Sequence, residues 1–175
     1  AAGPGLMMDR RELLALLGGA GLAGFACRPD SGQGDPSLQL AQGGPPYQFK
    51  ALDAHQAATV AVLVDCIIPA TETPGAAAAG VPEFIDVIVG EWYHPDERTQ
   101  FLAGLAELDQ RSAAVGSGRF LELDGGQQVA LLETVEAEAF AARKADPDAP
   151  TPFWLRLKSL TVYGYYNSAV GSLQE

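Results

Sequence analysis

The side chains most often used as metal ligands or nucleophiles are few and scattered in this sequence, which has two histidines and two cysteines. Neither His55 nor His94 has a second histidine or cysteine at a spacing typical of a metal site. Cys66 lies among aliphatic residues with no cationic neighbour to lower its pKa, so we expect a buried structural thiol. We therefore predict no metal site and no cysteine nucleophile, and we expect His94 to cap the turn before Pro95.

Carboxylates are the remaining candidates for acid–base or ligand chemistry. Glu133, Glu136 and Glu138 are at helical spacing but lack partner ligands, so a solvated helix face accounts for them. The sequence has no glycine-rich nucleotide loop, no nucleophile elbow and no CxxCH haem attachment motif. We therefore predict no catalytic, cofactor-binding or metal-binding residue in this chain.

The N-terminal region has the order of an export signal. Residues 9–14 form a charged head, and residues 15–26 form a Gly- and Ala-rich apolar stretch. This stretch is shorter and less apolar than a membrane span of about 20 residues. Arg10 and Arg11, one residue before Leu13 and Leu14, predict a twin-arginine signal and hence a periplasmic protein. The alternative is an amphipathic helix with two incidental arginines.

Cys27 ends the apolar stretch and follows small residues, as at a bacterial lipoprotein processing site, although Gly24 stands where an aliphatic residue is usual. Two interpretations stay open: lipidation of Cys27 after cleavage, or ordinary signal cleavage nearby. Stable attachment to a membrane needs more than one lipid chain, or a second signal such as a bound partner.

Composition limits the classes of partner. The chain has 175 residues, 47% of them hydrophobic, and a formal net charge of -11. Such acidity argues against nucleic acid, whose phosphates require surfaces rich in Lys and Arg. It also disfavours direct electrostatic binding to anionic lipid. With Cys66 alone in the domain, no disulfide framework is available.

Start and stop signals for helices divide the chain into a signal (1–27), a flexible linker (28–50) and a helical domain (51–175). Strand-like alternation is nowhere sustained. We therefore predict an all-α fold, an irregular bundle of about five helices. A capping box of Asp53 with Gln56 begins the first helix. The expected helices span residues 53–68, 82 to 90 or 92, 94–115, 124–140 and 151–166, the last with Thr151 as N-cap and Pro152 as first helical residue.

Most of the aromatic area near the C terminus falls on the last expected helix. Its members are Phe153, Trp154, Tyr163, Tyr165 and Tyr166. They point in several directions, so one helix cannot bury them all against its own domain. Tyr and Trp are preferred anchors of interfaces, which favours a partner surface here. Packing in the core alone is the other interpretation.

Several separated segments occur in an order that resembles the small subunit, subunit 3 or gamma, of the gluconate 2-dehydrogenase family of membrane-associated flavoprotein dehydrogenases. The resemblance runs from about Leu52 to the C terminus and includes the paired-arginine signal. Its segments are LVDCIIPA at 63–70, TPGA at 73–76, GVPEFID at 80–86, FW at 153–154 and KSLTVYGYYNS at 158–168.

This resemblance implies a non-catalytic partner of a large FAD-containing subunit of the glucose-methanol-choline oxidoreductase type. That subunit would oxidise a sugar, sugar acid or polyol, and a cytochrome c subunit with haem c would receive the electrons. The small subunit would carry the signal that the Tat translocase reads for both. We expect the partner interface at the loop of Pro74 and Gly75 and at the helix 154–166, with no cofactor in this chain.

Two other classes of protein compete with this expectation. A free-standing periplasmic lipoprotein would bind a small ligand in a helical pocket and would behave well alone. An enzyme in its own right would hold a cofactor as a purified single chain.

Overall fold

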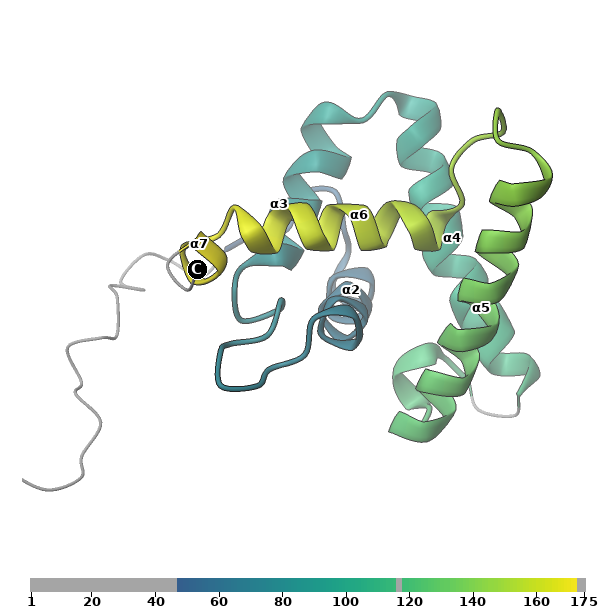
Figure 1. The fold of residues 1–175 in the computed structure, drawn as a ribbon, viewed down its shortest axis with the longest axis horizontal. Coiled ribbons are helices and arrows are strands. Elements are labelled where there is room, and N and C mark those ends of the chain that lie inside the picture. The colour runs from purple at the N-terminus through teal and green to yellow at the C-terminus, as the bar shows by residue number, and fades with distance from the viewer. Residues whose placement is uncertain (1–46, 116–117, 173–175) are drawn as a thin grey trace, which may run out of the picture. The chain divides into compact units, whose positions relative to one another are not determined.

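The computed structural model of this chain describes residues 47–115 and 118–172 (Figure 1). The predicted signal, including Arg10, Arg11 and Cys27, lies outside the described residues. Within them there are helices and no strand, which confirms the predicted all-α class. In chain order the helices are α2 (Ala54–Ile67), α3 (Val81–Val87), the π-helix η2 (Ile88–Trp92), α4 (Pro95–Ala114), the 3-10 helix η3 (Phe120–Glu122), α5 (Gly125–Ala145), α6 (Phe153–Tyr166) and α7 (Ala169–Ser172).

Two of the long helices begin at capping boxes. The Asp53 carboxylate accepts from the Gln56 backbone N–H at 2.8 Å, and the Gln56 side chain accepts from the Asp53 N–H at 3.0 Å. Asp124 and Gln127 repeat this exchange at the start of α5, at 2.9 and 3.1 Å. Each box satisfies two backbone donors that a helix start leaves without partners, so both helices begin where the sequence predicts.

Prolines lie at the starts of α3, α4 and α6. His94 is the N-cap residue of α4, ahead of Pro95, as expected. Pro82 lies in the first turn of α3, after Gly80 in the left-handed conformation with φ 82°. The start predicted for α6 is wrong by one residue. Pro152 is the N-cap and has an extended ψ of 145°, so Phe153 is the first helical residue.

Helix α6 is the central element of the domain. It contacts α2, α3, α4, α5 and α7, and Figure 1 shows it in yellow across the others. Leu157 and Thr161 on its inner face are fully buried. None of the described helices combines the length and the hydropathy that crossing a membrane would need.

The expectation that Cys66 is a buried thiol is wrong, because this residue is exposed. The buried face of α2 includes Val60, Leu63 and Val64, at the i, i+3, i+4 spacing of one helix face. Cys66 shares the opposite, exposed side with Asp65. Aliphatic neighbours in the sequence therefore do not make a residue part of the core when they lie on another face of the helix.

Candidate partner-binding site

The loop after α2 is folded around the Asp65 carboxylate. Asp65 Oδ1 accepts from the Ala77 backbone N–H at 2.8 Å. A Cβ atom added to Gly75 would lie 2.7 Å from Asp65 Oδ1 and 2.8 Å from the Ala70 nitrogen. Only glycine fits at this position without displacing its neighbours. Asp65 and Gly75, one from each of the first two segments that carry the resemblance, therefore determine the course of the loop.

Tyr165 of α6 holds the same loop from the other side. Its hydroxyl donates to the Pro74 carbonyl at 3.1 Å and lies 3.2 Å from the Thr73 hydroxyl oxygen. The side chain is 8% exposed, so these bonds are shielded from water. The structure thus brings together Pro74, Gly75 and Tyr165, three of the residues that the sequence predicted for the interface.

Helices α3 and α6 approach closely at Gly164. A Cβ atom there would lie 2.7 Å from Phe84 Cδ1, so the Phe84 ring packs directly on the glycine. The rings of Phe84 and Tyr163 lie 5.8 Å apart between centroids. Three of the segments that carry the resemblance, at 73–76, 80–86 and 158–168, therefore meet in space around the C-terminal half of α6.

The residues predicted for the interface differ in how far they are buried. Trp154 is 4% exposed, and Gly75 and Tyr165 are also buried. Phe153 is half-buried and packs against Gly104. Those at the surface are Pro74, Tyr163 and Tyr166, the last two 63% and 54% exposed.

Sequence reasoning missed Asp86, a fully buried carboxylate in α3. Its Oδ1 atom accepts from the backbone N–H groups of Ala51 and Leu52, each at 2.9 Å. Its Oδ2 atom accepts from the Lys50 N–H and the Tyr47 hydroxyl, also at 2.9 Å. We call this arrangement the Asp86 clamp. It holds residues 47–50, which the sequence assigns to the linker, against α3.

The clamp perturbs the acidity of both of its side chains. Burial by itself would raise the pKa of Asp86, but the three backbone N–H groups and the Tyr47 hydroxyl outweigh burial, and the pKa is lowered. Loss of water and the neighbouring Asp86 carboxylate raise the pKa of Tyr47 to about 12. The only signal in the sequence was a carboxylate inside the apolar run 84–89.

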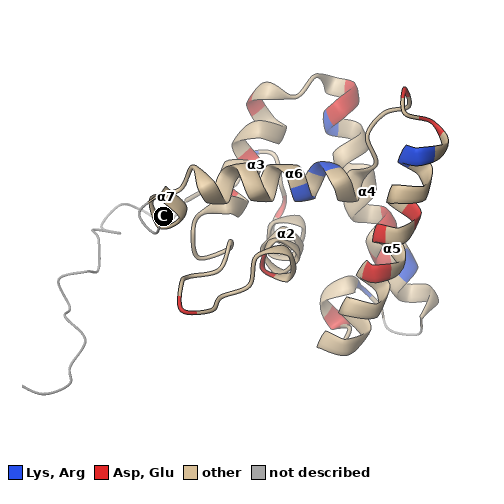
Figure 2. Ribbon diagram, viewed as in Figure 1, with Lys and Arg blue, Asp and Glu red and all other residues tan. Residues whose placement is uncertain are grey.

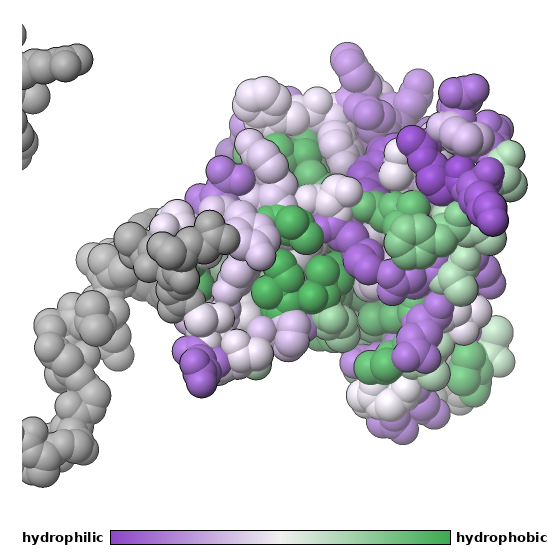
Figure 3. All heavy atoms as spheres, viewed as in Figure 1, coloured by the Kyte–Doolittle hydropathy of each residue, from purple (hydrophilic) through white to green (hydrophobic). Residues whose placement is uncertain are grey.

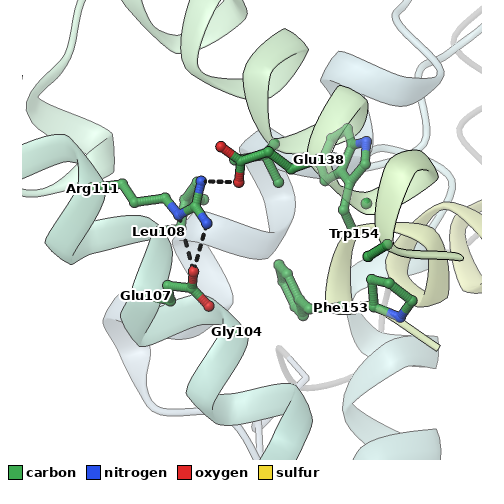
Figure 4. A pocket seen from close by; sticks show the side chains of 11 residues that line it. Gly104, Glu107, Leu108, Arg111, Glu138, Phe153 and Trp154 are labelled. Atoms are coloured by element: carbon green, nitrogen blue, oxygen red, sulfur yellow. Dashed lines mark hydrogen bonds and ion pairs between the residues drawn. The ribbon is translucent and has the colours of Figure 1, made fainter. Parts of the chain in front are cut away.

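A pocket of about 220 Å³ lies between α4, α5 and the start of α6 (Figure 4). Leu108, Phe153 and Trp154 are among the residues that line it. Arg111 at its edge donates to Glu107 at 2.7 Å and to Glu138 at 2.6 Å. Two carboxylates occupy this guanidinium at the edge, and the rest of the pocket offers mainly apolar surface.

The two remaining candidates for chemistry are His55 and Cys66. His55 Nε2 lies 2.6 Å from Asp109 Oδ2, and Asp109 Oδ1 accepts from the Phe120 N–H at 3.0 Å, so this pair joins α2 to α4 and η3. Partial loss of water and the adjacent Asp65 raise the pKa of the Cys66 thiol, which disfavours the thiolate. Among residues 47–115 and 118–172, no three His, Cys, Asp or Glu side chains gather as a metal site.

Comparison with known proteins identifies the family. The family profile described as gluconate 2-dehydrogenase subunit 3 matches residues 54–175, which is most of the chain. No curated protein and no solved structure matches it. The matched range contains α2 to α7 and therefore all three segments that meet at the C-terminal half of α6. The chain belongs to the gluconate 2-dehydrogenase subunit 3 family, a family of dehydrogenase subunits.

Proposed function

We propose that this chain is the non-catalytic small subunit of a periplasmic sugar, sugar-acid or polyol dehydrogenase. It docks to a large FAD-containing subunit of the glucose-methanol-choline oxidoreductase type, stabilises that subunit and escorts it out of the cytoplasm. Arg10 and Arg11 form the signal that the Tat translocase reads for both subunits. A cytochrome c subunit with haem c receives the electrons, and a lipid on Cys27 or the partner itself attaches the complex to the membrane.

One observation carries the docking part of this proposal: the outer face of the C-terminal half of α6 is aromatic and uncharged. Ser159, Val162, Tyr163 and Tyr166 follow each other at i, i+3, i+4 and i+7, and all four are exposed. Figure 2 shows charge on the N-terminal half of α6 and none on this half. Figure 3 shows apolar atoms gathered over α6 and α2 on the face of the molecule that it draws.

A helix face that only meets water normally carries charged residues, above all in a chain with a net charge of -11. Exposed tyrosines combine a large apolar ring with a polar hydroxyl, and interfaces are enriched in them. Pro74 belongs to the same region, because Tyr165 fastens its carbonyl to α6. We call Pro74, Val162, Tyr163 and Tyr166 the tyrosine face.

Folded export supplies the physical reason for an escort. A flavin is inserted while its protein folds in the cytoplasm, so the loaded subunit has to cross the membrane folded. A partner that is firmly docked and carries the signal takes it across. The twin-arginine route then serves a subunit that has no such signal of its own.

Co-expression with the large subunit tests the docking. Replacing Tyr163 and Tyr166 with Ser should remove the large subunit from the purified complex, because both rings would lose their apolar contacts. The matched control is Phe140→Ser, which removes another exposed aromatic ring, on α5. Equal loss with the control variant would contradict the assignment to α6, and retention of the complex in the double variant would do the same.

The signal is tested separately with Arg10 and Arg11 replaced by Lys. We expect the large subunit and its dehydrogenase activity to stay in the cytoplasmic fraction, still bound to this chain. Full periplasmic activity with the lysine variant, or without this chain, would end the escort proposal.

The pocket beside Phe153 and Trp154 favours a second function, that of a free-standing protein which binds a small apolar ligand there. That protein would be monomeric and soluble alone. The isolated chain should then bind an apolar dye, and Ala142→Leu, which fills the pocket lining, should remove the binding. An accessory subunit should instead self-associate through its tyrosine face.

A further inference from the structure

A shallow groove of about 450 Å³ lies between α2 and α3, beside the first described residues of the chain. Ala54, Ala58 and Ala61 form one wall along α2, and the first two of them are exposed. The remaining lining residues are Phe49, Ala57, Ala77, Pro82 and Glu83. Glu83 is thus the single charged side chain of an otherwise apolar groove.

Glu83 carries a carboxylate oxygen that lacks a donor. Its Oε2 atom is buried and has no hydrogen-bond partner among the described residues. A Glu at this position of a helix usually accepts from the N–H of the N-cap residue. That bond is unavailable here, because the Gly80 N–H already donates to the Ala77 carbonyl at 3.2 Å. A carboxylate oxygen shielded from water without a donor is costly. The rest of the Glu83 side chain is partly exposed in the groove, so a cation from outside the chain that reaches it there would offset this cost through its charge.

We propose that this groove receives an apolar segment of the large dehydrogenase subunit whose Arg or Lys side chain donates to Glu83. This inference rests on the proposed function and names a second contact of the same complex. Small alanine side chains leave room for a close approach, and the methylene stem of an Arg or Lys would cover them while its charged end reaches Glu83.

Charge complementarity favours a cation over a neutral donor. The chain has a net charge of -11, so its field attracts a basic partner segment during encounter. A charged donor also forms a stronger bond with a carboxylate than a neutral donor does. Ala54 and Ala58, both exposed, line the same groove as Glu83, whose Oε2 atom has no partner among the described residues.

The first test compares Glu83→Gln with Glu133→Gln, which neutralises an exposed carboxylate on α5. The affinity of each purified full-length variant for the large subunit is measured over a range of salt concentrations. Loss of a charged hydrogen bond should weaken binding by about tenfold for Glu83→Gln, with a smaller salt dependence, and Glu133→Gln should bind as the wild type does. Equal affinity and equal salt dependence for the two variants would overturn the proposal.

The second test blocks the groove without changing charge. Ala58→Gln adds bulk in the groove, and Ala137→Gln adds the same side chain on an exposed site of α5. We expect only Ala58→Gln to weaken binding to the large subunit. If wild-type chain binds the large subunit and Ala58→Gln binds equally well, the groove inference fails and the proposed function stands. If wild-type chain does not bind, the proposed function fails.

A second copy of this chain is the competing occupant of the groove. Sedimentation of the isolated full-length chain distinguishes it. If Ala58→Gln abolishes self-association, the groove belongs to a dimer and the proposal is overturned. If Ala58→Gln leaves self-association unchanged, a second copy does not occupy the groove, which supports the proposal.

Discussion

Replacing Asp86 with Asn should destabilise the domain strongly, because the Asp86 clamp depends on two negatively charged oxygens. Asn keeps one acceptor oxygen for the Ala51 and Leu52 N–H groups but places an NH2 group opposite the Lys50 N–H, a donor against a donor. Losing charge-assisted bonds at a fully buried site costs about 2–4 kcal/mol of the free energy of unfolding. For a domain whose total stability is about 5–15 kcal/mol, that is a large share.

Urea unfolding of the full-length chain, followed by far-UV circular dichroism, measures this loss. With a slope of about 2 kcal/mol per molar urea, the midpoint should fall by about 1–2 M. Asp148→Asn is the matched control, since Asp148 is an exposed loop residue, and it should change stability by less than about 0.5 kcal/mol. Tyr47→Phe removes one of the four donors and should cost about 0.5–1.5 kcal/mol.

The pH dependence provides a sharper check. The pKa of Asp86 is lowered in the folded protein, so its ionised form stabilises the fold. This contribution is complete above the unfolded value of about 3.9 and is lost as the pH falls through the folded pKa. The difference between wild type and Asp86→Asn should therefore shrink in acid. A loss below about 1 kcal/mol at pH 7, or the same loss at pH 7 and pH 3, would refute this account of the clamp.

Three further predictions concern packing, pairing and reactivity. Gly164→Ala should lower the free energy of unfolding by about 1–3 kcal/mol, because the added Cβ would collide with Phe84. Gly125 has open space around it, so Gly125→Ala should not lower the free energy of unfolding, and urea unfolding compares the two variants. His55→Ala removes the pair with a carboxylate of α4 and should cost about 1 kcal/mol in the same assay, and an unchanged midpoint would contradict a stabilising role. Alkylation of the exposed Cys66 by iodoacetamide should be slow at pH 7 and accelerate above pH 9, because the pKa of its thiol is raised; rapid labelling at pH 7 would disprove the raised pKa.

Features that depend on adjacent residues were predictable from the sequence. The starts of α2 and α5 follow from capping boxes, in which both partners lie three residues apart. The start of α6 was missed by one residue, because the fixed φ of Pro152 suits both an N-cap and a first helical position. Cys66 was misplaced because burial depends on the face of α2 that meets its neighbours, which its flanking residues do not reveal.

The candidate site could not be predicted in the same way, because it depends on contacts between distant parts of the chain. The donors of the Asp86 clamp come from residues 34–39 positions earlier, and no local pattern marks them. The sequence did reveal an excess of aromatic residues on the last helix. Which of them point inward depends on where Phe84 and Pro74 pack against α6, so the burial of Tyr165 and the exposure of Tyr163 could only be known from the fold.

Three of the four donors of the Asp86 clamp are main-chain groups. Its three backbone donors would be supplied by any residue type at positions 50–52 except proline, which has no N–H. The prolines at 45 and 46 come shortly before this stretch. As far as the clamp is concerned, positions 50–52 can therefore diverge in composition over evolution with proline alone prohibited, whereas position 47 contributes through its side chain.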